Sequence, residues 1–319
     1  MACKGAGNPA PSSRSLMNTR ALTRSRRDTL FSFFLDVPAL VITIAFILVP
    51  IIDSVVKSFQ DFGVRNIISG RPGVWNNFAN YLYLTKTDAF LSATIITFSF
   101  VLGVVLVQFA LSLLLALILN TDVKGARFLR SVMMTPWVVP TVISALIWMW
   151  LFQPQYGLVK YLAGLFSFGS VTDFAILNNP KTALSGVGVA ALWKQIPLMS
   201  LLLLAGLQNV PQEINEAAMI DGAGKLRRFY SVTLPYLSPV IKVSISMSII
   251  ENFKQFPLFW TMTGGGPNNA TTTLAVLSYR EAFVSMNLGA GASITTLWML
   301  MMILVVFFYN RIFRLQELG

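Results

Sequence analysis

The sequence contains no histidine and only one cysteine, Cys3. Without histidine, and with one cysteine, the chain has no ligand set for a zinc site and no base for a His-dependent catalytic triad. One cysteine also excludes an intrachain disulfide. Charged residues are scarce as well, at 12% of the 319 residues, against about 25% in an ordinary soluble domain. Metalloenzyme and hydrolase interpretations are therefore weak.

What the sequence has instead is long apolar runs, with 55% hydrophobic residues overall. A hydrocarbon core about 30 Å thick needs about 20 helical residues, and residues 89–119, 131–159 and 282–310 each exceed that without a single charge. We predict an all-α polytopic membrane protein: a disordered basic cytoplasmic tail over residues 1–30, then a six-helix transmembrane domain over 31–319. The predicted spans are about 33–57, 89–119, 131–152, 183–208, 235–262 and 282–310.

The net charge of +11 is explained by membrane orientation. Lysine and arginine lie near the ends of the apolar runs, without the basic stripe and interleaved aromatics of a nucleic-acid surface. Fourteen of the 24 fall in the tail, the loops 121–130 and 209–234, and the C-terminus, whereas seven fall on the other side. Because positive residues favour the cytoplasm, both termini should be cytoplasmic, with membrane lipid around the spans.

The segment Val210–Pro239 is a polar interruption in this apolar sequence. Pro211 suits a first helical turn, and Glu213 and Glu216 lie where the positive end of the helix dipole favours carboxylates. We expect a short helix with an apolar side, followed by a turn at Gly222. The run Gly222–Lys225 superficially resembles a phosphate-binding loop, but it lacks the required spacing and the serine or threonine.

This segment resembles the EAA loop of bacterial ABC-importer permeases. The matching residues are Glu216, Ala217, Ala218, Gly222, Val232, Leu234 and Pro235. The resemblance implies a cytoplasmic coupling helix over about 211–224, including Glu213 and Asp221, that docks into a groove on an ATPase subunit. The alternative is an amphipathic cytoplasmic loop with no partner.

The second informative stretch is Glu251–Pro267. Charges at membrane depth are costly, so Glu251 and Lys254, three residues apart on one helical face, should face a cavity or each other. Residues at i, i+4, i+7 and i+8 form a polar-to-aromatic stripe that would suit a sugar ring and its hydroxyls, although such stripes more often serve packing than binding. Its members are Asn252, Phe256, Phe259 and Trp260.

This stretch also resembles the maltose-type permeases, through Phe253–Phe256 and Thr263–Pro267. The resemblance places Lys254 and Gln255 at a mid-membrane sugar site. The lysine departs from that pattern and leaves open an anionic sugar or a phosphorylated polyol of the glycerol-phosphate type. Pro257 should kink this helix, and the prolines of the segment Met133–Pro140 should kink the third span. Trp193–Pro197 resembles the preceding core helix, where Lys194 faces the translocation path or snorkels to the interface.

The resemblance as a whole implies one permease subunit of a carbohydrate ABC importer, with the type I fold, in the inner membrane of a bacterium. It is not an enzyme and binds no cofactor, since ATP and Mg would lie in a dimeric ATPase partner. A second homologous permease and an extracytoplasmic solute-binding protein complete the expected assembly, which works by alternating access. The competing hypothesis is a secondary carrier or channel acting alone. An intramembrane enzyme has little support without histidine.

Overall fold

The computed structural model describes residue 31 and residues 33–121, 125–166 and 175–315. The predicted tail over residues 1–30 therefore lies outside the described residues. The chain divides into two compact units, Met1–Val56 and Lys57–Gly319. In the first unit, the described chain is helical from Phe33, with a π-helical turn η1 (Ile44–Leu48), and continues into α2 (Val49–Ser58).

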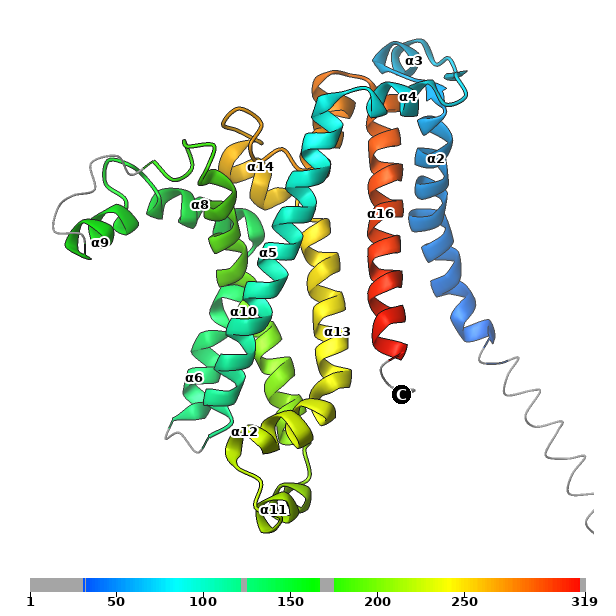
Figure 1. Cartoon of the computed structure of the whole chain (residues 1–319). Coiled ribbons are helices and arrows are strands. Elements are labelled where there is room, and N and C mark those ends of the chain that lie inside the picture. The colour runs from blue at the N-terminus through cyan, green and yellow to red at the C-terminus, as the bar shows by residue number, and fades with distance from the viewer. Residues whose placement is uncertain (1–30, 32, 122–124, 167–174, 316–319) are drawn as a thin grey trace, which may run out of the picture. The chain divides into compact units, whose positions relative to one another are not determined.

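The second unit is helical apart from one small hairpin, as far as the structure describes it (Figure 1). Its first half contains β1 (Gln60–Asp61), α3 (Val64–Ser69), β2 (Val74–Trp75), α4 (Ala79–Thr85), α5 (Asp88–Leu119), α6 (Ala126–Met133), α7 (Thr135–Val138), α8 (Thr141–Leu151) and α9 (Leu158–Phe166). Its second half contains α10 (Ala183–Gln208), α11 (Gln212–Ile220), α12 (Lys225–Arg228), η2 (Phe229–Thr233), α13 (Leu234–Phe253), α14 (Pro257–Thr263), α15 (Leu274–Tyr279), η3 (Arg280–Val284) and α16 (Leu288–Leu315). Strands β1 and β2 pair antiparallel, Gln60 opposite Trp75.

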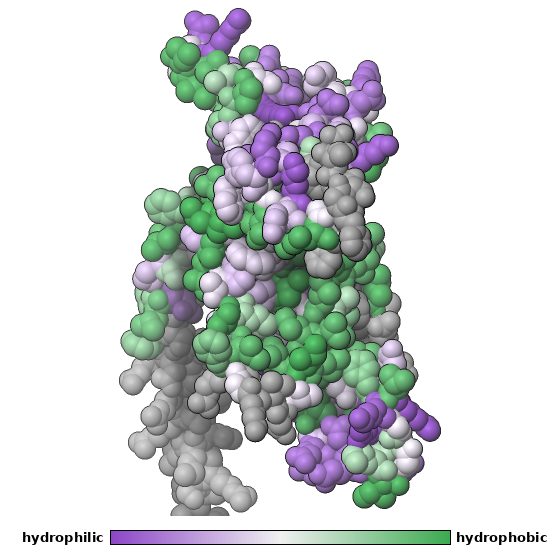
Figure 2. All heavy atoms as spheres, turned by 90° about the vertical axis from the view of Figure 1, so that its left-hand side faces the viewer, coloured by the Kyte–Doolittle hydropathy of each residue, from purple (hydrophilic) through white to green (hydrophobic). Residues whose placement is uncertain are grey.

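Among the described residues, five helices are long and apolar enough to cross a membrane, and six spans result if one bent pair counts as a span. The five are Phe33–Ser58, Asp88–Leu119, Ala183–Gln208, Lys225–Phe253 and Leu288–Ile312. This confirms the prediction of an all-α polytopic membrane protein. In Figure 2, hydrophobic side chains fill the middle of the visible face, and hydrophilic ones gather above and below them.

Two of the predicted spans are broken rather than kinked. Residues 128–138 and 141–151 meet at 96°. Pro140 cannot donate a hydrogen bond and forces the preceding residue out of the helical region, and Val139 is accordingly extended, with ψ 131°. Likewise, α13 ends at Phe253 and α14 begins at Pro257, the position of a helix that tolerates proline best. Where the sequence predicted a kink at Pro257 within the span 235–262, the structure has a break between two helices.

The last predicted span also differs, because α16 begins at Leu288 rather than near residue 282. The residues before it form η3 and a short turn, in which Met286 has φ 57°. Helix α15 and turn η3 both pack against α16. They are therefore separate short elements at the end of this span.

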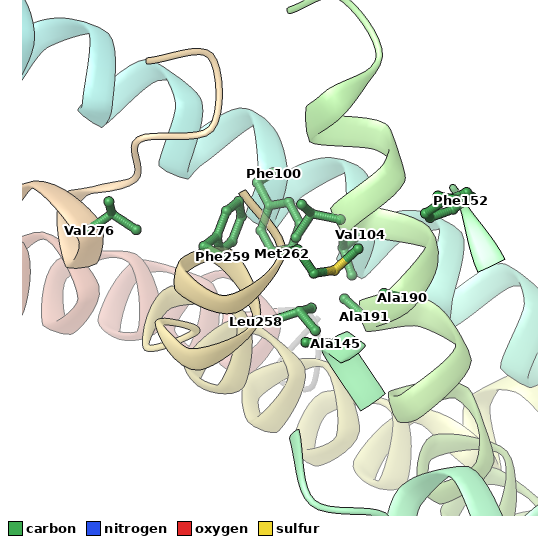
Figure 3. Close-up of a cluster of buried hydrophobic side chains, with 11 residues drawn as sticks. Phe100, Val104, Ala145, Phe152, Ala190, Ala191, Leu258, Phe259, Met262 and Val276 are labelled. Carbon is green, nitrogen blue, oxygen red and sulfur yellow. The ribbon is translucent and has the colours of Figure 1, made fainter. Parts of the chain in front are cut away.

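The short helix α14 forms the centre of one hydrophobic core cluster (Figure 3). Leu258 and Phe259 are fully buried there. They contact Phe100 of α5, Ala145 of α8 and Ala191 of α10. The break after α13 thus lets the chain turn its apolar side chains into the bundle while the polar residues of the break stay outside the core.

On the α11 side of the bundle, α10 and α13 approach closely through Gly206. A Cβ atom at Gly206 would lie 2.9 Å from Leu237 Cδ1 and 3.0 Å from Val240 Cγ2. Leu237 is fully buried in a second cluster with Ala116, Leu203 and Leu207. Small residues that let backbones approach are the usual basis of helix packing in membranes, and this contact brings the polar faces of α10 and α13 together.

Candidate functional site

A cavity of about 290 Å³ lies between α5, the α7–α8 break, α10 and α13. Apolar side chains such as Trp137, Leu198 and Met247 form part of its wall. Its polar wall consists of Gln108, Thr141, Lys194, Gln195, Ser244, Ser248, Glu251 and Gln255. Lys194 and Gln195 lie at the middle of the 26-residue helix α10, so the cavity is at mid-span depth.

One side of the cavity is closed by a chain of hydrogen-bonded amides. Gln195 Nε2 donates to Asn252 Oδ1 over 3.1 Å, and Asn252 Nδ2 donates to Gln195 Oε1 over 2.9 Å. Asn252 Nδ2 also lies 2.9 Å from the Ser248 carbonyl. Ser248 Oγ donates to Gln108 Oε1 over 2.6 Å. Three helices are thereby joined through polar groups that lipid could not satisfy.

Lys194 connects α10 to the broken span. Its ammonium donates to the carbonyls of Trp137, over 3.2 Å, and of Val139. These carbonyls lie at the end of α7, where Pro140 has no N–H with which to continue the helix. The lysine therefore satisfies backbone groups that the break exposes, and its positive charge lies where a helix C-terminus favours a cation.

Glu251 and Lys254 form the predicted ion pair, at 2.7 Å, and their side chains are 56% and 55% exposed in the isolated chain. This confirms that the two charges face each other. Glu251 also lines the cavity, whereas Lys254 is not one of its lining residues.

The predicted stripe of Asn252, Phe256, Phe259 and Trp260 does not share one helical face, because the helix breaks after Phe253. Asn252 is 2% exposed, within the amide chain, and Phe259 packs edge-on against Phe100 at 4.7 Å in the core. Phe256 and Trp260 do lie together, with centroids 5.8 Å apart. Both contact Tyr279. Gln255, just before them, lines the cavity.

The loop after α14 is held by Arg280. One guanidinium nitrogen of Arg280 donates to the Gly264 carbonyl over 2.6 Å, and the other to Asn269 Oδ1 over 2.7 Å. Gly265 has φ 92°, and a Cβ there would lie 2.6 Å from Thr272 Oγ1 and 3.0 Å from the guanidinium. Only glycine fits this position, which explains part of the glycine run in the sequence.

The polar segment Val210–Pro239 contains the expected short helix, α11, from Gln212 to Ile220. It ends in a Schellman motif: Gly222 N donates to the Met219 carbonyl over 3.0 Å, and Ala223 N to the Ala218 carbonyl over 2.9 Å. Gly222 has φ 75°, which explains the glycine.

The surface of this segment is exposed and partly apolar. Met219 is 58% and Ile220 88% exposed, beside the exposed side chains of Glu213, Glu216, Ala217 and Asp221. Ala218 is half-buried. Leu234 and Pro235 start α13, and Leu234 packs against the second core cluster.

A family model described as "Binding-protein-dependent transport system inner membrane component" matches residues 108–317. The chain belongs to this family. The trehalose/maltose transport system permease protein of Thermococcus litoralis is 33% identical to this chain, over 91% of this chain and 96% of that protein. The sn-glycerol-3-phosphate transport system permease protein of Salmonella typhimurium is 32% identical, over 91% and 95%.

A solved structure shows the same fold as this chain. It is a bacterial alginate ABC transporter in complex with an alginate pentasaccharide-bound periplasmic protein. One of its chains matches with a TM-score of 0.76 at 19% identity, covering 92% of this chain and 96% of that one. The two relatives at 32–33% identity are named as transport system permease proteins, which confirms the prediction of a transport permease subunit rather than an enzyme.

The roles of several residues of the site are not apparent from the sequence alone. Gln108 and Ser248 carry the amide chain, and Tyr279 and Arg280 hold the aromatic group and the glycine loop. A lone glutamine in the charge-free run 89–119 was the only available signal for Gln108. The pairing of Tyr279 and Arg280 with α14 depends on a loop geometry that periodicity does not reveal.

We predict that Gln195 and Asn252 are energetically coupled. Asn252→Ala leaves the Gln195 amide without its partner, as does the reverse change, so the double variant should be more stable than the sum of the two losses implies. The expected coupling is about 0.6–1.7 kcal/mol, the range for polar pairs between membrane helices. Unfolding free energies from detergent titration give the double-mutant cycle. Strict additivity would contradict the pairing.

Proposed function

We propose that this chain is one permease subunit of an importer that carries a sugar or oligosaccharide through the cavity between α10 and α13. The observation that carries the proposal is a polar cavity at mid-span depth in a chain of a binding-protein-dependent transport family. The named cargo of the relatives, trehalose or maltose in one case and glycerol 3-phosphate in the other, supports a polyhydroxylated substrate.

The charges of the cavity favour a neutral substrate. Among the described lining residues, Lys194 and Glu251 carry the formal charges, one of each sign. Lys194 is engaged by two carbonyls, and Glu251 by Lys254. What remains for the substrate is mainly amide and hydroxyl groups, which suit sugar hydroxyls. An anionic sugar or phosphorylated polyol is the second candidate, because Lys254 could turn its charge toward such a cargo.

Gln255 is the cavity-lining member of the proposed substrate residues. Asn252 acts beside it through Gln195, and Lys254 through Glu251. Phe256 and Trp260 offer partly exposed rings next to Gln255, where a sugar face can stack. Phe259 contributes by fixing α14 in the core.

Energy for transport would come from a partner. We propose that α11 and its flanking residues dock on a dimeric cytoplasmic ATPase that binds ATP and Mg. The residues concerned are Glu213, Glu216, Ala217, Ala218, Asp221 and Gly222, with Leu234 and Pro235 connecting the segment to α13. The exposed side chains of Met219 and Ile220 support such a contact, because a partner that covers them removes two large apolar side chains from water.

The full assembly would contain a second homologous permease and a solute-binding protein outside the membrane. Both termini and α11 would face the cytoplasm of a bacterial cell. Closure of the ATPase dimer around ATP would move α11. The chain runs from α11 through α12 and η2 into α13, so α13 would move as well. This movement would change the side of the membrane to which the cavity opens. A ligand-driven shift of this kind needs two states that differ in their contacts with the partner.

We predict that Gln255→Ala raises the KM for uptake by about threefold to tenfold, the effect of one lost neutral hydrogen bond. The measurement is uptake of labelled maltose, trehalose and glycerol 3-phosphate by the complete transporter in proteoliposomes with ATP. Gln208→Ala, an exposed glutamine at the end of α10, is the control. Unchanged uptake of the transported cargo by Gln255→Ala would place the pathway elsewhere. Preference for glycerol 3-phosphate would favour the anionic candidate.

We predict that Gly222→Asp uncouples the transporter without unfolding it. Substrate-stimulated ATP hydrolysis should fall roughly 5- to 150-fold, the usual range of coupling between sites. The matched control is Gly70→Asp. Gly70 also has a left-handed backbone, φ 64°, and has no atom within 4 Å of an added Cβ, but it ends α3, outside the coupling segment. Equal hydrolysis in both variants and the wild type would contradict the coupling role of this segment.

A further inference from the structure

A second pocket, of about 560 Å³, lies between the end of α8 and the short helix α9. It shares no lining residue with the cavity described above. Figure 1 shows α9 beside α8, on the side of the second unit away from α16. The described lining residues are Trp150, Gln155–Leu158, Lys160, Tyr161, Gly164 and Leu165. A volume of this size is typical of sites for small molecules.

The turn between α8 and α9 builds this pocket. Gly157 N donates to the Gln153 carbonyl over 2.8 Å, and a Cβ at Gly157 would lie 2.5 Å from the carbonyl oxygens of Leu151 and Gln153. Only glycine fits this turn. Lys160 Nζ then donates to the Pro154 carbonyl over 2.5 Å, which ties the first turn of α9 to the end of the broken span.

The lining combines exposed aromatics with one charge. Trp150 is 57%, Tyr156 63% and Tyr161 65% exposed, at the end of a membrane-spanning element. Amphipathic aromatics at this position are typical of the boundary between lipid and water. Among the described lining residues, Lys160 is the charged one and none is a carboxylate. An ammonium has three N–H donors, of which the Pro154 carbonyl takes one.

We infer that this pocket binds an anionic phospholipid, with its phosphate on Lys160 and an acyl chain along Trp150, Leu158 and Leu165. The tyrosine hydroxyls of Tyr156 and Tyr161 reach the polar headgroup level, as the aromatic rings at a membrane boundary usually do. A described lining with one lysine and no carboxylate matches a net negative headgroup better than a zwitterionic one, whose cation would find no acidic partner among these residues.

A water-soluble ligand fits this pocket less well. It could pair with Lys160, but the apolar wall of Trp150, Leu158 and Leu165 would then stay in contact with water. An acyl chain would cover that wall and leave the Lys160 charge at the boundary between lipid and water. Helices that lie at this boundary place their apolar and charged side chains in the same way.

The test is retention of labelled phosphatidylglycerol by the intact transporter after detergent exchange, with phosphatidylcholine as the comparison lipid. We expect Lys160→Gln to reduce phosphatidylglycerol retention about tenfold, as for one lost charge-assisted hydrogen bond. Lys181→Gln, an exposed lysine outside the pocket, should retain it as the wild type does. Equal retention by Lys160→Gln and wild type would overturn the inference, as would equal wild-type retention of both lipids.

A second pair of variants tests the pocket without removing the charge. Gly164 lines the pocket, and an added Cβ there has no atom within 4 Å, so a larger side chain extends into open space. Gly164→Phe should therefore displace the lipid, whereas Gly164→Ala should keep it. Substrate-stimulated ATP hydrolysis reports whether each variant is folded. A folded Gly164→Phe transporter that retains phosphatidylglycerol fully would contradict the assigned pocket.

Discussion

Backbone groups that leave a helix inside a membrane must find new hydrogen-bond partners, and the central part of this structure follows from that constraint. Pro140 breaks one span, and Lys194 satisfies the carbonyls that this break exposes. The chain breaks again before Pro257, where the Lys254 and Gln255 amides still donate to the Ile250 and Asn252 carbonyls. The separate loop after α14 is satisfied by Arg280 and by threonines. Both breaks place polar side chains at depths where an unbroken helix would be apolar.

The first break also shapes the cavity that we propose as the transport pathway. A continuous third span would carry its own hydrogen bonds and leave Lys194 without carbonyl partners. Instead, Trp137 and Thr141 on either side of the break join Lys194, Gln195 and Glu251 around a polar cavity. The amide chain from Gln108 to Asn252 joins α5, α10 and α13 beside it. A polar pathway in a bundle with few charges therefore depends on a small number of fully satisfied contacts.

Much of the fold was predictable, because charge-free runs of more than 20 residues have few interpretations. The short helix at Gln212–Ile220 and the pairing of Glu251 with Lys254 also follow from local spacing. The sequence did not reveal that the prolines break two spans completely, since a proline inside a helix can also kink it. Because α13 ends at Phe253, helical periodicity does not relate Asn252 to Phe259. Asn252 belongs to the chain of hydrogen-bonded amides, whereas Phe259 packs in the core.

Transport would depend on two parts of the chain: the mid-span cavity through which substrate would pass, and the exposed helix α11 through which a partner would drive it. The most direct measurement is a cryo-electron microscopy structure of the intact transporter with its ATPase subunits and transported sugar. It should show Met219 and Ile220 buried in a groove of an ATPase subunit, and sugar density against Gln255. An α11 helix without any protein contact, or sugar density on the far side of α10, would contradict the account.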